Sequence, residues 1–127
     1  MRSCVLILCV LLTACNTPGF GFSGIAPVRV TVGQSRFDVR VDGARAQAIR
    51  VNPEWAPRFT SVAARGAAAM AEVSGCRVAR IRGDQAVMLA DLDCGPDARL
   101  LPAGHAYDCE RDHVYGRATE LTCTPRL

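Results

Sequence analysis

Apolar and polar residues alternate in three consecutive runs, and this pattern limits the fold more than any other feature of the sequence. The first run covers residues 28–32 and the second covers residues 37–41. The dipeptide Asp42-Gly43, which favours a tight hairpin turn, precedes a weaker third run at residues 47–51. A period of two with one charged side indicates strands that bury one face only. We therefore predict three antiparallel strands in a meander.

The period changes after Asn52-Pro53, where apolar residues begin to recur at spacings of three and four. This spacing indicates an amphipathic helix whose apolar face covers a sheet. Gly75 fits the position just beyond the C-terminus of such a helix. Gly66 would cost about 1 kcal/mol relative to alanine in a helix, and we interpret it as a close-packing position on the sheet. The apolar face consists of Trp55, Phe59, Val62, Ala63, Gly66, Met70 and Val73.

A second hairpin is predicted between Cys76 and Cys94. If its turn is centred on residues 83–86, Cys76 lies opposite Cys94, Val78 opposite Leu92, and Arg77 opposite Asp93. One register therefore satisfies a cysteine pair, an apolar pair and a pair of opposite charges. Residues 95–104 have no period and are expected to form a loop. The polar stretch beyond them is short of core residues.

These elements predict a single α+β domain in the order β-β-β-α-β-β, stabilised by disulfides. A chain of 127 residues and 13.6 kDa fits one domain, and an apolar content of 50% fits an ordinary globular fold. We expect the helix to cover one face of a small antiparallel sheet. In this arrangement Trp55, Phe59, Val62, Met70 and Val73 meet Val30, Val39, Val41, Ile49, Val78 and Leu92.

The N-terminal residues have the pattern of a secretory signal. Met1-Arg2 gives a positive start, and residues 5–12 form an apolar run that is shorter than the roughly 20 residues needed to span a bilayer. The run leads into Leu12-Thr13-Ala14-Cys15, which resembles the lipobox of bacterial lipoproteins. The resemblance ends near residue 16 and carries no information about the domain.

In the lipoprotein class the signal is cleaved just before the cysteine, and that cysteine is acylated. The resemblance therefore implies that residues 1–14 are removed and that Cys15 carries lipid and holds the protein to a membrane. Residues 15–26 would then be the lipid anchor with a flexible tether, and residues 27–127 the domain. By resemblance to lipoproteins of Gram-negative bacteria, Asn16 suits export to the outer membrane, facing the periplasm. The alternative is an ordinary signal peptide that leaves Cys15 as a plain thiol.

Four cysteines remain once the signal residues and Cys15 are set aside. An even count in an exported chain of this size indicates two disulfides. Of the three connectivities, we favour Cys76–Cys94, which closes the second hairpin, together with Cys109–Cys123, which ties down the C-terminal tail. The second bond closes a loop that is worth roughly 3 kcal/mol in the chain-entropy model.

A metal site would have to use His105, Cys109 and His113, whose spacing of four would share one helix face, with Cys123 as a fourth zinc ligand. An oxidising compartment would instead consume both thiols in a disulfide. We therefore expect no metal and no cofactor, and His105 and His113 remain the candidates for a ligand or metal site.

No catalytic residue is predicted. The chain has no G-x-S-x-G motif. Asp91 and Asp93 would share a strand face, but Arg77 opposite Asp93 favours a solvated row of ion pairs over a pair of catalytic carboxylates. A net charge of +3, from 15 Arg and 12 acidic residues of interleaved sign, is too weak to indicate nucleic acid as a partner.

The sequence therefore predicts a non-catalytic lipoprotein of the bacterial cell envelope. In this interpretation it is a small binding or assembly module, held to the membrane by Cys15, and its partner is another envelope protein. The alternative is a ligand- or metal-binding periplasmic lipoprotein that uses the region of His105 and His113.

Overall fold

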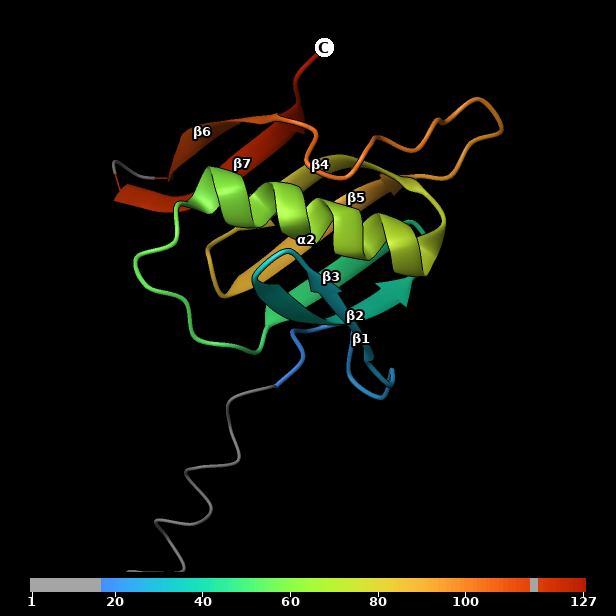
Figure 1. The fold of residues 1–127 in the computed structure, drawn as a ribbon, viewed down its shortest axis with the longest axis horizontal. Coiled ribbons are helices and arrows are strands. Elements are labelled where there is room, and N and C mark those ends of the chain that lie inside the picture. The colour runs from blue at the N-terminus through green and yellow to red at the C-terminus, as the bar shows by residue number, and fades with distance from the viewer. Residues whose placement is uncertain (1–16, 115–116) are drawn as a thin grey trace, which may run out of the picture.

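A computed structural model describes residues 17–114 and 117–127. For residues 112–114 and 117–119 it describes the backbone only. In the described part of the chain a seven-stranded antiparallel sheet carries one helix across one of its faces (Figure 1). The α+β class agrees with the prediction, but the sheet has seven strands rather than five. The elements are β1 (Val28–Val32), β2 (Ser35–Asp42), β3 (Arg45–Arg50), α2 (Phe59–Ser74), β4 (Arg77–Gly83), β5 (Val87–Asp93), β6 (Tyr107–Val114) and β7 (Arg117–Pro125).

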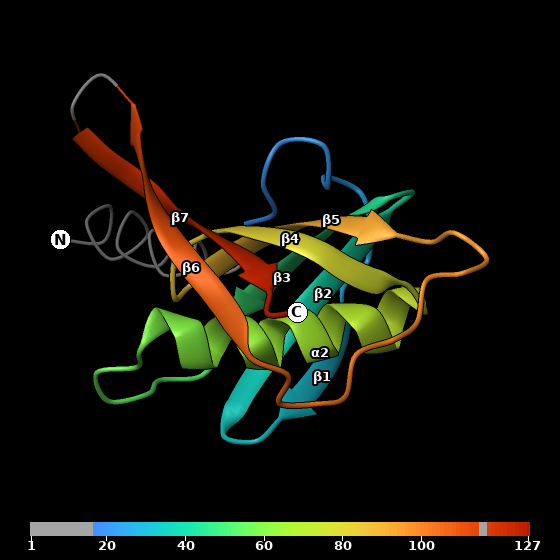
Figure 2. The same cartoon turned by 90° about the horizontal axis from the view of Figure 1, so that it is seen from above.

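The strand order across the sheet is β1-β2-β3-β5-β4-β7-β6. β1 to β3 form the predicted meander, and the β4–β5 hairpin then joins it by pairing β5 with β3. β7 pairs with β4, so β1 and β6 lie at the two edges. Figure 2 shows α2 on one side of the sheet and the segment that precedes β1 on the other. We call these two sides the helix face and the rear face.

The β4–β5 hairpin has the predicted register at its open end, with Arg77 opposite Asp93 and Val78 opposite Leu92. A bulge between Val78 and Arg80 then shifts the pairing by one residue. The shift places Ile81 on the helix face, where it is fully buried. Without the bulge, the period of two would direct the charged Arg80 into the core instead.

α2 has the predicted C-terminus and the predicted close contact with the sheet. Gly75 follows the helix with a φ of 70°, and its N–H donates to the carbonyl of Ala71. Gly66 faces the sheet so closely that a Cβ built on it would lie 2.5 Å from Cε of Met88. The interpretation of Gly66 as a close-packing position is therefore confirmed.

The core lies between α2 and the helix face, and two residues predicted to belong to it lie elsewhere. Trp55 precedes α2 and is 98% exposed. Ile49 is buried, but it pairs with Asp38 in the register and therefore lies on the rear face. Ala46 and Ala48 supply the helix-face residues of β3, and both are fully buried. The prediction assigned the wrong face of β3 to the core, because the residues buried on the helix face are small alanines and the larger Ile49 lies on the opposite face.

The C-terminal stretch is not a strandless tail, because β6 and β7 form a hairpin that extends the sheet. Cys109 lies directly opposite Cys123, and the two are joined by a disulfide with Cα atoms 4.0 Å apart. Cys76 and Cys94 form the other disulfide, at the open end of the β4–β5 hairpin. Both predicted connectivities are therefore present.

The segment before β1 packs on the rear face, although the sequence predicted a flexible tether there. Phe22 is only 2% exposed. The N–H of Gly19 donates to Oε1 of Gln47 at 3.3 Å, and Nε of Arg40 donates to the carbonyl of Ile25 at 3.0 Å. Phe22 fixes the segment to the sheet by burying its ring. The prediction missed this contact because the segment is rich in glycine and proline, which is typical of a flexible linker.

The predicted signal peptide, residues 1–14, and the predicted lipidation site, Cys15, lie outside the described residues. Within the described part of the chain, α2 is too short and too polar to cross a bilayer.

Candidate functional site

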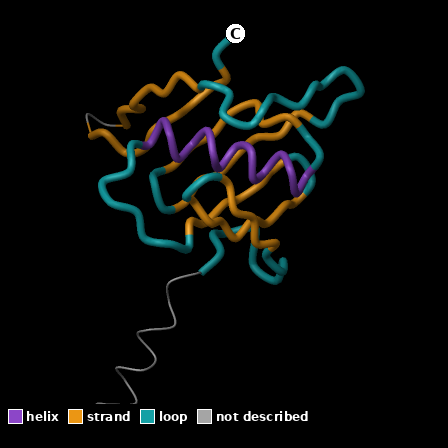
Figure 3. Tube along the Cα trace, in the orientation of Figure 1, coloured by secondary structure: helices purple, strands orange, loops and turns teal. Residues whose placement is uncertain are grey.

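A groove with a volume of about 420 Å³ lies between α2, the β1–β2 turn and the loop that joins β5 to β6. Figure 3 shows this loop as the long connection that returns over the sheet from β5 to β6. Val32 lines the groove from β1, and Ala68 and Ala71 line it from α2. Leu100 and Leu101 form the opposite wall. Alanines on the helix leave this space open, so the groove offers a mainly apolar surface.

Few polar side chains line the groove. Thr31 lines it from β1, where it pairs with Arg36, and Glu72 lines it from α2. Leu100 is 55% exposed, so part of the apolar wall of the groove is open to solvent. The groove is therefore suited to hold an apolar group.

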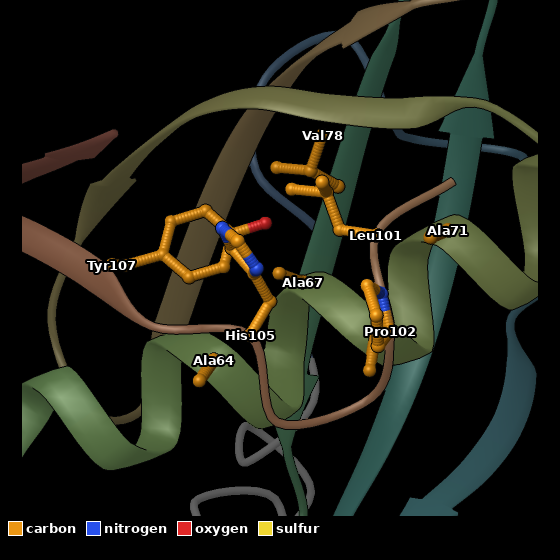
Figure 4. Close-up of a pocket in the computed structure, with 9 residues that line it drawn as sticks. Ala64, Ala67, Ala71, Val78, Leu101, Pro102, His105 and Tyr107 are labelled. Atoms are coloured by element: carbon orange, nitrogen blue, oxygen red, sulfur yellow. The ribbon is translucent and has the colours of Figure 1, made fainter. Parts of the chain in front are cut away.

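A second, much narrower cavity continues from the groove, and it shares the residues Ala68, Ala71 and Leu101 with it. His105 and Tyr107 lie at its far end, above α2 (Figure 4). Its volume of about 10 Å³ is close to the minimum that one water molecule requires. The two cavities together form a groove with a narrow inner end.

The inner end is held in place by Arg126, the residue that follows β7. Nε2 of His105 lies 2.9 Å from the carbonyl oxygen of Arg126, and because that oxygen can only accept, Nε2 carries the proton. The ring of His105 packs edge-on against the ring of Tyr107, with centroids 6.0 Å apart. Burial raises the pKa of the Tyr107 phenol, and the charge of Arg77 opposes this rise. The phenol is therefore neutral at physiological pH.

Two of the four residues proposed as zinc ligands are not available to a metal ion. Cys109 and Cys123 are consumed by their disulfide. His105 lies in the loop before β6 and forms a hydrogen bond with the carbonyl of Arg126. His113 is a residue of β6 whose side chain is not among those described. Among the residues whose side chains are described, no three His, Cys, Asp or Glu residues are grouped to hold a metal ion.

The paired carboxylates Asp91 and Asp93 belong to the predicted row of ion pairs on the rear face. Asp93 binds Arg77 at 2.7 Å, and Asp91 binds Arg80 at 2.6 Å. Arg82 is a more distant partner of Asp91, at 3.8 Å. Both carboxylates are therefore neutralised by arginine, and the interpretation of a solvated row of ion pairs is confirmed.

A buried ionic cluster around Glu54 was not predicted. The Glu54 side chain is only 6% exposed, and its Oε2 lies 2.8 Å from Nη2 of Arg65. Nη1 of Arg50 lies 3.8 Å from Oε1, and the buried hydroxyl of Ser35 donates to the same oxygen. Since Ser35 has no exposed surface and the carboxylate is paired, the cluster fixes the loop between β3 and α2 and offers no reactive group. Only the spacing of four between Arg50 and Glu54 could have signalled it.

No known protein family, curated protein or solved structure matches this chain. Its function must therefore be inferred from its own residues.

Proposed function

We propose that the chain is a lipid-anchored protein of the bacterial cell envelope whose domain is a non-catalytic assembly module. The resemblance of Leu12-Thr13-Ala14-Cys15 to a lipobox supports the anchor, and Asn16 favours the periplasmic side of the outer membrane. The observation that carries the binding role is the apolar groove between α2 and the β5–β6 loop. Its lining brings apolar and small side chains together without a paired nucleophile and base among the described residues.

The proposed partner is an extended segment of another envelope protein. β1 lies at the edge of the sheet, and among the described strands it pairs only with β2. A strand edge can bind an extended peptide through main-chain hydrogen bonds, while alternate side chains enter neighbouring pockets. Thr31 and Val32 belong to β1 and also line the groove. A segment added to β1 would therefore direct every second side chain towards Ala71 and Leu100.

Photo-crosslinking in native membranes tests this role. A photoreactive residue at Leu100 should yield one reproducible protein product, and the same probe at Arg80, a similarly exposed residue of the rear face, should not. The substitution Ala71→Trp, which fills the groove, should abolish the product while the disulfides remain intact. A product that persists at full yield in the Ala71→Trp variant, or no product from Leu100, would contradict the role of the groove.

The anchor is tested by the intact mass of the protein extracted from its own membrane under non-reducing conditions. The expected mass corresponds to cleavage before Cys15, added acyl chains and the loss of four hydrogens in two disulfides. An uncleaved chain or an unmodified Cys15 would refute the lipoprotein assignment, whatever the groove binds.

A second candidate function, binding of a small ligand or a metal ion, is favoured by one observation. The imidazole of His105 lines the narrow inner end of the groove, where a polar group of a ligand would meet it. Titration of the full chain with zinc, compared with the variant His105→Ala/His113→Ala, tests the metal form of this function. Equal affinity in the two proteins would eliminate it.

A further inference from the structure

The segment before β1 is fixed to the sheet rather than free to move as a linker. The chain turns at residues 19–22, where the N–H of Phe22 donates to the carbonyl of Gly19 at 3.1 Å. Gly19 approaches the sheet so closely that a Cβ on it would lie 2.6 Å from Nε2 of Gln47. The guanidinium of Arg45 lies 5.7 Å from the centre of the Phe22 ring. Turn, hydrogen bonds and buried ring together hold this segment on the rear face.

Cys15 lies only two positions before Thr17, the first described residue. An extended chain spans at most about 3.6 Å per residue, so this distance cannot exceed roughly 7 Å. A lipid attached to Cys15 would therefore hold the surface around residues 17–20 directly at the bilayer. The domain has no linker that would let it move away or turn over.

The surface held there has the side chains of a membrane interface. Phe20 is fully exposed, with a relative exposure of 104%, although Phe22 two residues later is buried. Phe20 shares a cavity of about 60 Å³ with Arg45, Arg82 and Leu89 of the rear face. Exposed phenylalanine rings insert at the boundary between lipid headgroups and acyl chains. Arginine is suited to the same depth, because its apolar stem lies along lipid while its charged end reaches the phosphates.

Of the two arginines that line this cavity, Arg82 has the longer ion pair. Its Nη2 lies 3.8 Å from Asp91, whereas Arg80 binds the same carboxylate at 2.6 Å. Nε of Arg82 is buried and makes no hydrogen bond with the described residues. A lipid phosphate would supply the anionic partner that Asp91 provides only at a distance.

We propose that the rear face of the sheet rests on the phospholipid bilayer, with Phe20 in the headgroup region and Arg45 and Arg82 at the phosphates. This inference rests on the proposed acylation of Cys15. α2 and the groove lie on the opposite side of the sheet from the segment that carries Phe20 (Figure 2). The groove therefore faces away from the membrane, where a partner can reach it.

The test uses the full chain, processed and extracted from its own membrane and reconstituted into phosphatidylethanolamine–phosphatidylglycerol vesicles. The natural tryptophan is removed by Trp55→Phe, a change at a residue that is 98% exposed. One variant then carries Phe20→Trp and the matched control carries Leu100→Trp, an exposed apolar residue that lines the groove on the helix side. Lipids brominated on their acyl chains quench tryptophan only where it contacts the bilayer.

We expect the Phe20→Trp protein to shift its emission to the blue and to lose most of it in brominated vesicles, while the Leu100→Trp protein keeps its emission. Quenching of neither probe, or of both equally, in a protein whose mass shows acylation at Cys15 would refute the orientation and leave the proposed function intact. A mass that shows no acylation would refute the proposed function, and the membrane contact with it.

Discussion

Cε of Met88 occupies the space that a side chain on Gly66 would need, since a Cβ at that position would lie 2.5 Å from it. Met88 is fully buried, and the ring of Phe37 lies close to the same point. The methionine end is flexible, but it can move only by disturbing its packed neighbours. This contact sets the distance between α2 and the sheet.

Gly66→Ala should therefore lower the free energy of unfolding by about 1 to 2 kcal/mol, because the cost of overpacking exceeds the gain in helix propensity of about 1 kcal/mol. Urea unfolding measures the change. In a Met88→Ala background the same substitution should be neutral or stabilising, since the obstacle is gone. An equal loss in both backgrounds would show that the Met88 contact is not the cause.

Glu54→Gln should lower the free energy of unfolding by about 3 kcal/mol, the usual cost of removing one partner from a buried ion pair. The substitution leaves Arg65 and Arg50 without their counter-charge in a site where the Glu54 side chain is 6% exposed. Asp42→Asn is the matched control, because it breaks an ion pair with Arg45 in which both side chains are about half exposed. It should cost less than about 1 kcal/mol. Similar losses in the two variants would contradict the structural role of the Glu54 cluster.

Replacement of Cys109 and Cys123 by alanine should cost about 3 kcal/mol, because the disulfide joins residues 14 apart in sequence and closes a loop of corresponding size. The loss of stability should first affect the β6–β7 hairpin, which the disulfide joins. Hydrogen exchange should show that amides of β6 and β7 lose protection, while amides of β2 and β3 at the other side of the sheet keep it. Uniform loss of protection would mean that the hairpin and the meander unfold as one unit.

Stability should fall at alkaline pH because the pKa of Tyr107 is raised in the folded protein by burial. The phenol binds its proton more tightly when folded, so its contribution is complete below the pKa of the unfolded chain and is lost as the pH rises through the folded pKa. Tyr107→Phe should remove this part of the alkaline loss. Unfolding midpoints measured across the alkaline range in both proteins check the prediction, and identical slopes would contradict it.

The sequence predicted those elements whose apolar residues are both regular and large. The valines of β1 and β2, the apolar face of α2 and the three opposed pairs of the β4–β5 hairpin all specify one arrangement. β3 was placed one residue out of phase because Ala46 and Ala48, rather than Ile49, face the helix. β6 and β7 were not predicted because they have few apolar residues in a regular pattern. The Cys109–Cys123 disulfide supplies much of the stabilisation that pairs of apolar side chains supply in the other strands.

The candidate site could not be predicted, because its parts meet only in the folded chain. The groove needs the β1–β2 turn, the middle of α2 and the β5–β6 loop, three segments that share no local pattern. Nor could the sequence alone show which of Phe20 and Phe22 is buried, since each directly follows a glycine in the same short segment. The buried position of one ring and the exposed position of the other follow from a turn whose contacts include hydrogen bonds with Gln47 and Arg40, residues far away in the sequence.

If Cys15 is acylated as proposed, its short connection to the sheet also limits where this protein can find a partner. A domain of this size has a radius of gyration of about 13 Å, so an acylated chain held flat on lipid reaches only a few nanometres into the periplasm. Its encounters then take place by lateral diffusion, in two dimensions. A partner that occupies the groove must itself be embedded in the same leaflet or pass close along its surface.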